Sequence, residues 1–207
     1  MVEPLEALAS ARVHTSCAQM RRSKNLHRVW GTEASNVWVV GSGGTILKYN
    51  GSSWSTLPSD TATSFDGIWG SDPNNIWAVG TDHVGTIFKY NGSSWIAQEI
   101  DLWGNILGVW GTDANNVWAV SSTGSGILKW DGTAWSAQAV GTNNALFGVW
   151  GTDTNNVWVV GLHGRIRKFD DTSWSEQSRG PMDDLKGVWG SDAKNSWAVG
   201  QPGLFSD

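Results

Sequence analysis

The sequence predicts an all-β fold, a five-bladed β-propeller built from four-stranded antiparallel blades. The motif Trp-Gly-[Ser/Thr]-[Asp/Glu]-x-x-Asn-x-Trp occurs five times, and its first tryptophans are 39, 41, 40 and 39 residues apart. A fixed internal period in this range is the signature of a solenoid, a propeller or an array. Each repeat also contains four short segments rich in Val, Ile and Trp, with glycine or polar residues between them, which is typical of strands. Four antiparallel strands per repeat fit one propeller blade.

The first two strands of each repeat, A and B, carry the motif and are expected to form the buried part of a blade. In the fourth repeat they are predicted over residues 146–150 and 157–160. Strand B is an unbroken apolar run, as in residues 37–40, which indicates that both of its faces are covered. The turn between A and B carries an acidic residue, and such side chains commonly bind their own backbone. A cation held by a ring of these carboxylates is the disfavoured alternative, because calcium takes about six to eight oxygen ligands.

The last two strands, C and D, are predicted around residues 46–49 and around Trp54 in the first repeat. The pairs Asn50-Gly51, Asn91-Gly92 and Asp131-Gly132 stand between these strands. Such pairs accept positive φ angles and close two-residue hairpins. A β-sandwich is the alternative fold, but it requires strands with alternating apolar and polar faces, and it gives no reason for so regular a period.

The spacing of the tryptophans predicts how the propeller closes. The third tryptophan of a repeat stands 15 residues before the next motif, and Thr15 holds that place before Trp30. Residues 203–205 stand where the last repeat needs its strand C. We therefore predict that residues 12–20 supply strand D of the last blade, which leaves no exposed inner sheet edge. In this prediction residues 1–11 are an extension, and residues 12–207 form a single closed, monomeric propeller domain.

Composition limits the function classes. The chain has 207 residues and a net charge of −5, which argues against general nucleic-acid binding because that function usually shows a basic surface. Cys17 is the single cysteine, which excludes an internal disulfide and a cysteine-based zinc site. No apolar run is long enough for a transmembrane helix. The N-terminus lacks the features of a signal peptide, and the cellular compartment stays open.

The repeat resembles a known type of bacterial propeller repeat. The strings Asn-x-Val-Trp-Ala-Val-Gly, Gly-Thr-Ile-Leu-Lys-Tyr and Asn-Gly-Ser-Ser-Trp are similar to the BNR and photosystem-assembly-factor repeats, over residues 26–205. The resemblance implies a propeller fold, although the turn before the strand D tryptophan is one residue shorter than in the BNR Asp-box. BNR repeats occur in sialidases, whose chemistry needs an arginine cluster and a Tyr–Glu pair. Because Tyr49 and Tyr90 both occupy repeat positions, no sialidase site is predicted.

No motif of a serine hydrolase, a zinc peptidase, a P-loop or an EF-hand is present. We therefore expect a protein that is not an enzyme and that uses no cofactor and no metal. A rigid ring with variable loops fits a binding module for a carbohydrate, as in a lectin, or for a protein. One alternative is a structural or engineered repeat scaffold without a dedicated ligand, and another is a glycan-processing enzyme with its site at the channel mouth. Arg28 replaces a glycine that recurs in strand A of the other repeats, and it is expected to line the central channel.

The ligand is expected on the face that carries the B–C and D–A connections, because these loops vary while the A–B turns are nearly constant. Fifteen of the 16 tryptophans occupy repeat positions and are expected in the core, whereas Trp103 does not. An exposed tryptophan beside Asp and Asn is a common arrangement for binding a sugar ring. The alternative is that Trp103 packs against its own blade. The candidate ligand-binding residues are Trp103, Asp101, Asn105, Asp82, His83, His163 and Arg165.

Overall fold

The computed structural model describes residues 24–82, 84–100, 104–123, 126–139, 141, 144–177 and 183–201. These residues form five antiparallel sheets, one from each repeat, and each strand pairs with its neighbour in sequence. The first sheet contains β1 (Leu26–Glu33), β2 (Asn36–Gly41), β3 (Thr45–Tyr49) and β4 (Trp54–Thr56). The second contains β5 (Ser64–Asp72), β6 (Asn75–Asp82), β7 (Val84–Tyr90) and β8 (Trp95–Gln98). The third contains β9 (Ile106–Asp113), β10 (Asn116–Ser121), β11 (Ile127–Trp130) and β12 (Trp135–Gln138).

The fourth sheet contains β13 (Leu146–Asp153), β14 (Asn156–Gly161), β15 (Ile166–Phe169) and β16 (Trp174–Glu176), with a short 3-10 helix, η1 (Leu162–Gly164), between β14 and β15. The fifth contains β17 (Asp184–Asp192) and β18 (Asn195–Gln201). The prediction of an all-β fold made of four-stranded antiparallel sheets is therefore confirmed for the first four repeats. No helix in these described residues is long and apolar enough to cross a membrane.

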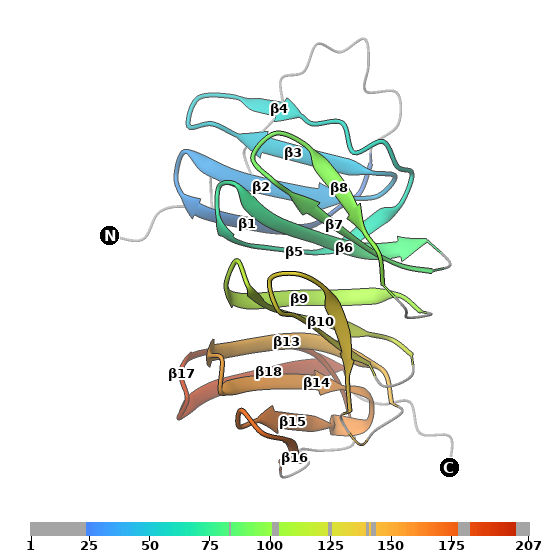
Figure 1. The fold of residues 1–207 in the computed structure, drawn as a ribbon, viewed down its shortest axis with the longest axis vertical. Helices are drawn as coiled ribbons and strands as arrows, with labels where there is room; N and C mark the ends of the chain where they lie inside the picture. The colour runs from blue at the N-terminus through green and yellow to red at the C-terminus, as the bar shows by residue number, and fades with distance from the viewer. Residues whose placement is uncertain are drawn as a thin grey trace.

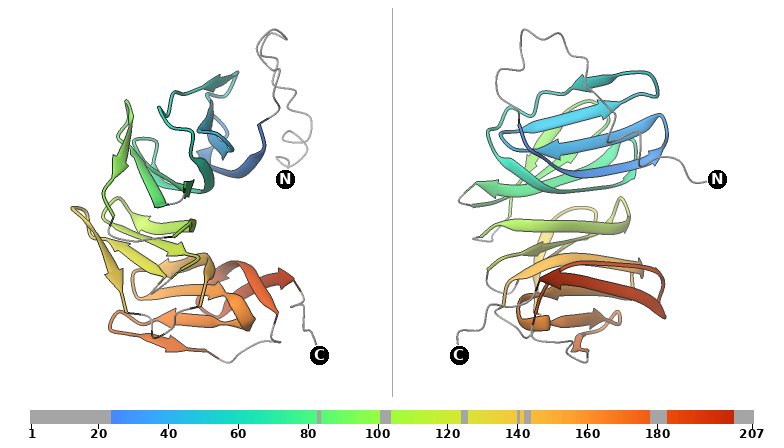
Figure 2. Two further views of the ribbon diagram at one scale, coloured as in Figure 1. Left: turned by 90° about the vertical axis from the view of Figure 1, so that its right-hand side faces the viewer. Right: turned by 180° about the vertical axis from the view of Figure 1, so that it is seen from behind.

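The five sheets follow one another along an open arc, with the first and the last sheet at its two ends (Figure 1; Figure 2, left). Within the described part of the chain, no strand pairing joins these two sheets. Residues 12–20 and 203–205, which are predicted to complete the last blade, lie outside the described residues, as does the predicted extension over residues 1–11. The closed five-bladed ring therefore stays a prediction.

In four of the five A–B turns the acidic residue is an aspartate that holds its own backbone, as predicted. In the turn between β5 and β6, Asp72 Oδ1 accepts a hydrogen bond from the backbone N–H of Asn74 at 2.8 Å, and both carboxylate oxygens accept from the side-chain amide of Asn75. Asp113, Asp153 and Asp192 form the same contacts in the later turns. Partial burial raises the pKa of Asp72, but these hydrogen bonds outweigh it and leave the pKa below its ordinary value.

The hairpins predicted between strands C and D are present, but the Asn-Gly pair does not fill their two loop positions. The backbone N–H of Asn50 donates to the backbone oxygen of Ser53 at 3.2 Å, which leaves Gly51 and Ser52 between the bonded residues. Tyr49 pairs with Trp54, so four residues separate β3 from β4. Asn50 Oδ1 accepts hydrogen bonds from the backbone N–H groups of Ser52 and Ser53 at 3.0 and 2.9 Å, which fixes an Asx-type turn. Gly51 has a φ of +93°, as the Asn-Gly pair predicts. The two-residue loop therefore begins at Gly51, one residue later than the Asn-Gly pair predicts.

Two of these C–D turns contain an aspartate in place of Asn50, which makes them sensitive to acid. Backbone and side-chain hydrogen bonds lower the pKa of Asp131 and of Asp170 to about 2. Because the folded pKa lies below the ordinary value of 3.8, each carboxylate stabilises the fold above that pH, and the contribution is lost as the pH falls towards about 2.

We expect the double variant Asp131→Asn, Asp170→Asn to lose less thermal stability than the wild type between about pH 4 and about pH 2, because the amide keeps the acceptor oxygen and does not titrate there. Circular-dichroism melts across this range measure the effect. Asp171→Asn is the matched control, since it removes a charge from a turn residue adjacent to Asp170 and leaves the acceptor intact. Equal acid dependence in the double variant and the wild type would contradict the expectation.

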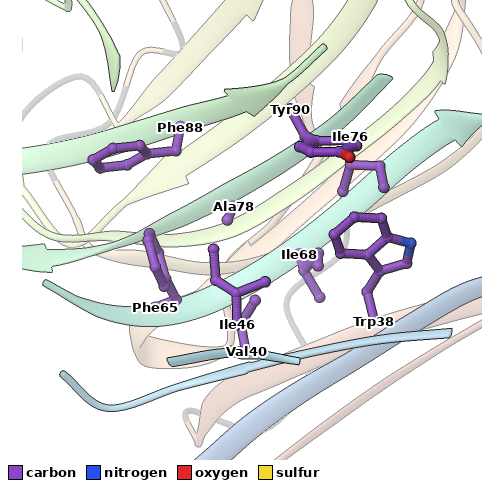
Figure 3. Packing of buried hydrophobic residues seen from close by; sticks show 9 residues of the cluster. All are labelled: Trp38, Val40, Ile46, Phe65, Ile68, Ile76, Ala78, Phe88 and Tyr90. Atoms are coloured by element: carbon purple, nitrogen blue, oxygen red, sulfur yellow. The ribbon is translucent and has the colours of Figure 1, made fainter. Parts of the chain in front are cut away.

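The core lies between consecutive sheets. Trp38 of β2 packs against the second sheet, where its ring centroid lies 5.0 Å from that of Tyr90, beside Ile68 and Ile76 (Figure 3). The same joint recurs between the second and third sheets and between the third and fourth. The strand B tryptophans of the first four sheets are between 0% and 7% exposed. Covering of both sheet faces explains the unbroken apolar run of strand B.

The prediction that all fifteen repeat tryptophans lie in the core is wrong for the last repeat. Trp189 of β17 is 62% exposed and Trp197 of β18 is 55% exposed. The physical reason is their position, because the face of the fifth sheet on which they lie has no following sheet in the described structure. The equivalent side chains of the first four repeats are covered by the next sheet along the chain.

Candidate functional site

A cavity of about 320 Å³ lies where the first strands of all five sheets converge. It is lined by His27, Arg28, Asp66, Leu107, Phe147 and Lys186. Five of these residues occupy the same repeat position, three residues before the first tryptophan of the motif, on β1, β5, β9, β13 and β17. Each sheet therefore contributes one side chain to the cavity from an equivalent place.

This position differs from the rest of the motif because its side chain changes in every repeat. The five sheets place histidine, aspartate, leucine, phenylalanine and lysine there, whereas the tryptophan three residues later is constant. Packing between equivalent sheets explains why the tryptophan is constant. It does not explain why five different side chains occur at one position of the cavity wall. A variable position on an otherwise similar strand of a rigid scaffold is typical of a ligand site.

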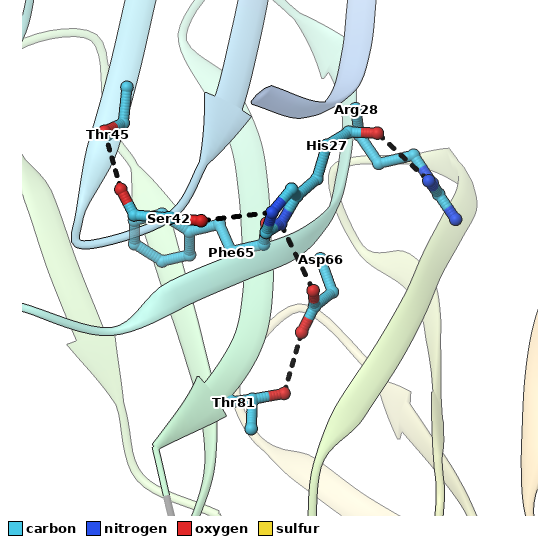
Figure 4. A network of polar contacts seen from close by, with 7 residues as sticks. All are labelled: His27, Arg28, Ser42, Thr45, Phe65, Asp66 and Thr81. Carbon is cyan, nitrogen blue, oxygen red and sulfur yellow. Dashed lines mark hydrogen bonds and ion pairs between the residues drawn. The ribbon is translucent and has the colours of Figure 1, made fainter. Parts of the chain in front are cut away.

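One side of the cavity is a hydrogen-bonded network between the first two sheets (Figure 4). His27 Nδ1 lies 2.8 Å from the carbonyl oxygen of Phe65 and 3.3 Å from Asp66 Oδ1. Because a carbonyl oxygen only accepts, Nδ1 carries the proton and donates. Nε2 of the same ring lies 3.2 Å from the hydroxyl of Ser42. Thr81 donates to Asp66 Oδ2 at 2.7 Å, so the carboxylate is held from two sides.

The opposite side contains a lysine held by an acid and an aromatic ring. Lys186 Nζ lies 3.1 Å from Asp184 Oδ2 and 3.6 Å from the ring centroid of Phe147. Asp184 Oδ1 also accepts a hydrogen bond from the backbone N–H of His163 at 3.3 Å. Partial burial raises the pKa of Asp184, but the hydrogen bonds from Lys186 and His163 outweigh it, so that the pKa lies below its ordinary value.

Arg28 gives the cavity a second cation. Its guanidinium donates from Nη1 to the backbone oxygen of His27 at 3.0 Å. Within the described residues the Arg28 side chain forms no ion pair, whereas Lys186 pairs with Asp184 and Asp66 contacts the imidazole of His27. A guanidinium has five N–H donors in a planar fork that matches a carboxylate. Arg28 is therefore the group best placed to meet an anionic ligand. Its expected place in a central channel stays a prediction, because the channel requires the closed ring.

The cavity lies on the face that the sequence predicts for binding. Ser42 lies in the B–C connection of the first sheet, and Thr81 lies near the end of β6, where the B–C connection of the second sheet begins. Ser42 contacts His27, and Thr81 contacts Asp66. The acidic A–B turns lie at the other ends of the same strands. In the described part of the chain, no group of three or more His, Cys, Asp or Glu side chains is placed to hold a metal ion.

The structure places three of the predicted site residues elsewhere on this face. Asn105 precedes β9, and its backbone oxygen accepts from the N–H of Ser122 at 2.9 Å. His163 is exposed in η1 with a φ of +59°. Arg165 has a side chain that is 14% exposed, and it lies 3.6 Å from Glu176 Oε1 within its own sheet. None of these three lines the cavity.

The other predicted site residues are not placed in detail. Asp82 ends β6, and nothing further is described for its side chain. Asp101, Trp103 and His83 lie outside the described residues. A ligand role for these residues stays a prediction.

Sequence reasoning missed five residues of the cavity, namely His27, Asp66, Leu107, Phe147 and Lys186. The signal was present in the aligned repeats. The position three residues before the first tryptophan is the one place in strand A where the five copies carry five unrelated side chains. Reading the repeats for their variable position, in addition to their constant ones, would have found it.

No family model and no curated protein matches the sequence. Solved structures with a similar fold include YCF48 from Cyanidioschyzon merolae, with a TM-score of 0.63 and 16% identity, over 90% of this chain and 69% of that chain. A catalytically inactive virginiamycin B lyase from Staphylococcus aureus, solved with quinupristin, has a TM-score of 0.73 and 13% identity, over 87% of this chain and 65% of that chain.

The computationally designed Ika8 protein has a TM-score of 0.65 and 13% identity, over 86% of this chain and 58% of that chain. These structures are β-propeller-type proteins, so the likeness shows a propeller fold for this chain. This chain spans about two thirds or less of the lyase and the designed protein.

Proposed function

We propose that the protein is a non-enzymatic binding module that takes up an acidic segment of a partner protein in the cavity formed by its first strands. The observation that carries this proposal is the convergence of five equivalent but chemically different side chains on one cavity. Arg28 and Lys186 supply positive charge to it, and the chain as a whole has a net charge of −5. Lys186 pairs with Asp184, and Asp66 lies in the same wall, so the guanidinium of Arg28 is the feature that favours an anionic ligand.

The walls of the cavity indicate what else the ligand carries. Leu107 and Phe147 offer apolar surface next to the two cations. A peptide with an aspartate or glutamate beside a leucine or phenylalanine would meet both kinds of wall, with its carboxylate at Arg28. Charge-assisted hydrogen bonds to such a carboxylate contribute about 1.5–3 kcal/mol each.

A carbohydrate ligand is the second candidate, and the cavity favours it less. Sugar rings stack on open aromatic faces, but the amine of Lys186 lies 3.6 Å from the ring centroid of Phe147 and occupies one face of that ring. A glycan-processing reaction usually needs two carboxyl groups across the scissile bond. Asp66 is the carboxylate in the cavity wall, and it is held by His27 and Thr81. A scaffold without a ligand would leave the variable position unexplained.

We expect Arg28→Gln to weaken the binding of acidic, apolar peptides about tenfold or more, because it removes the charge-assisted bonds to the carboxylate. A panel of fluorescent peptides, measured by anisotropy, gives the dissociation constants. Added salt should weaken binding to the wild type as well, since it screens the partly exposed cations.

Lys194→Gln is the matched control for this experiment. It removes one positive charge from the turn between β17 and β18, at the far ends of the strands, and it should leave the peptide affinity unchanged. Equal losses in the two variants, or binding of a glycan panel with no binding of any acidic peptide, would contradict the proposed function.

A further inference from the structure

The joints between consecutive sheets share one interlocking contact. The strand A tryptophan of each sheet lies over the glycine that follows the equivalent tryptophan in the next sheet. A β-carbon on that glycine would come within 2.5 to 2.8 Å of the indole ring at all four joints. The pairs are Trp30 with Gly70, Trp69 with Gly111, Trp110 with Gly151, and Trp150 with Gly190. Only a glycine leaves room for the ring, so tryptophan and glycine form a knob and its seat.

Each end of the arc carries one half of this contact. Trp189 is the fifth knob, and it is 62% exposed. Gly31 is the fifth seat, and the nearest atoms to a β-carbon there belong to Asn36 and Val37 of its own hairpin. No tryptophan of the described residues covers Gly31, and no glycine of a following sheet receives Trp189.

The surface around Trp189 and the surface around Gly31 are both apolar and exposed. A groove of about 480 Å³ on the β17–β18 face is lined by Gly187, Val188, Trp189, Trp197 and Val199. Val199 is 67% exposed, whereas the equivalent Val40 is fully buried at the first joint. At the other end Val29 is 49% exposed, whereas the equivalent Ile68 is 8% exposed. Apolar patches of this kind mark interaction surfaces on soluble proteins.

We propose that the β17–β18 face binds the first sheet of a second copy of this chain, with Gly31 of that copy seated under Trp189. The two end faces are different and complementary, so the contact is head-to-tail, and each copy keeps one half free for a further copy. The joint needs no new chemistry, because its geometry already occurs four times within the chain.

Contact between the two ends of one chain is the competing arrangement, and the packing disfavours it. The first and last sheets lie apart at the two ends of the arc (Figure 2, left). Closing the arc would change the angle at the internal joints, where Trp38, Trp77 and Trp118 are at most 1% exposed. Close-packed joints resist such a change because every displacement opens voids or forces overlaps.

Two complementary variants test the second-copy contact. Trp189→Asp removes the tryptophan of the β17–β18 face and leaves the face around Gly31 intact. Val29→Asp places a charge on the face around Gly31 and leaves Trp189 intact. In sedimentation experiments the wild type should form larger species as its concentration rises, and each variant alone should stay monomeric. An equimolar mixture should form a heterodimer and stop there, because only one intact knob and one intact seat face remain.

Ile96→Asp is the control. Ile96 is an apolar residue on the outer strand β8, and its exposure of 48% is close to the 49% of Val29. It should associate like the wild type, and all three variants should keep the melting temperature of the dilute wild type. A mixture that stays monomeric would overturn the proposal. So would a wild type that is monomeric at every concentration and that loses thermal stability on Trp189→Asp, because this is the result expected of a ring closed within one chain. Neither variant changes a cavity-lining residue, so the peptide assay reports separately on the proposed function.

Discussion

Replacing Trp118 with alanine is expected to unfold the protein or to leave it barely stable. Trp118 is 1% exposed, and it packs between the third and fourth sheets against Val157 and Phe169. Removing a buried tryptophan costs about 3–5 kcal/mol, through the lost apolar burial and the cavity that remains. Domains of this kind have a total stability of roughly 5–15 kcal/mol. Chemical denaturation followed by circular dichroism measures the difference in the free energy of unfolding.

The fifth repeat supplies the matched control. Trp197 holds the same repeat position as Trp118, pairs with Trp189 as Trp118 pairs with Trp110, and is 55% exposed. Trp197→Ala should therefore cost far less than Trp118→Ala when both are measured in the Val29→Asp background, in which the chain is expected to stay monomeric. Similar losses in the two variants would show that burial between sheets is not what makes these tryptophans important.

The second large effect is expected at the seats that receive the strand A tryptophans. Gly151→Ala would place a β-carbon 2.7 Å from the ring of Trp110 and 2.5 Å from the carbonyl oxygen of Asn156. Neither the packed ring nor the backbone of the paired strand has room to move away. Inserting a methyl group into such a joint costs about 1–3 kcal/mol, so the melting temperature should fall by several degrees.

Gly31→Ala separates the two causes of this loss. A β-carbon at Gly31 would meet the carbonyl oxygen of Asn36 at 2.7 Å, but it would meet no tryptophan of the described residues. In dilute protein Gly31→Ala should therefore cost less than Gly151→Ala, by the amount due to the ring. If the two variants lose the same stability, the loss comes entirely from the contact with the paired strand, and the tryptophan–glycine contact does not stabilise the protein.

The repeat explains why so much of the fold could be predicted. Strand B is apolar on both faces because sheets cover both of them, and the A–B aspartates bind their own turn. These are local or periodic causes, which a sequence displays directly. The place of the C–D loop was predicted one residue too early, because the backbone N–H groups of Ser52 and Ser53 bind the side chain of Asn50 and the Asn-Gly rule takes no account of these bonds.

The exposure of Trp189 and Trp197 could not be predicted from the sequence period. Their repeat positions are the same as those of Trp110 and Trp118, and the difference in exposure arises because no described sheet follows theirs. The cavity was missed for a related reason. His27 and Lys186 are far apart in sequence and meet at one cavity only because the arc brings the first strands of all sheets together. A motif search compares residues that are close in sequence, whereas this site is found by comparing one position among the five repeats.

The most direct test of the proposed binding function is a chemical-shift titration of ¹⁵N-labelled protein with the acidic peptide that binds most tightly. The backbone amides of the cavity residues on the first strands, among them Asp66, Leu107 and Lys186, should shift together and saturate with the dissociation constant found by anisotropy. Arg28→Gln should require about tenfold or more peptide to reach the same shifts. Shifts confined to the C–D turns around Asn50 and Asp131, with the amides of the cavity unchanged, would contradict the account.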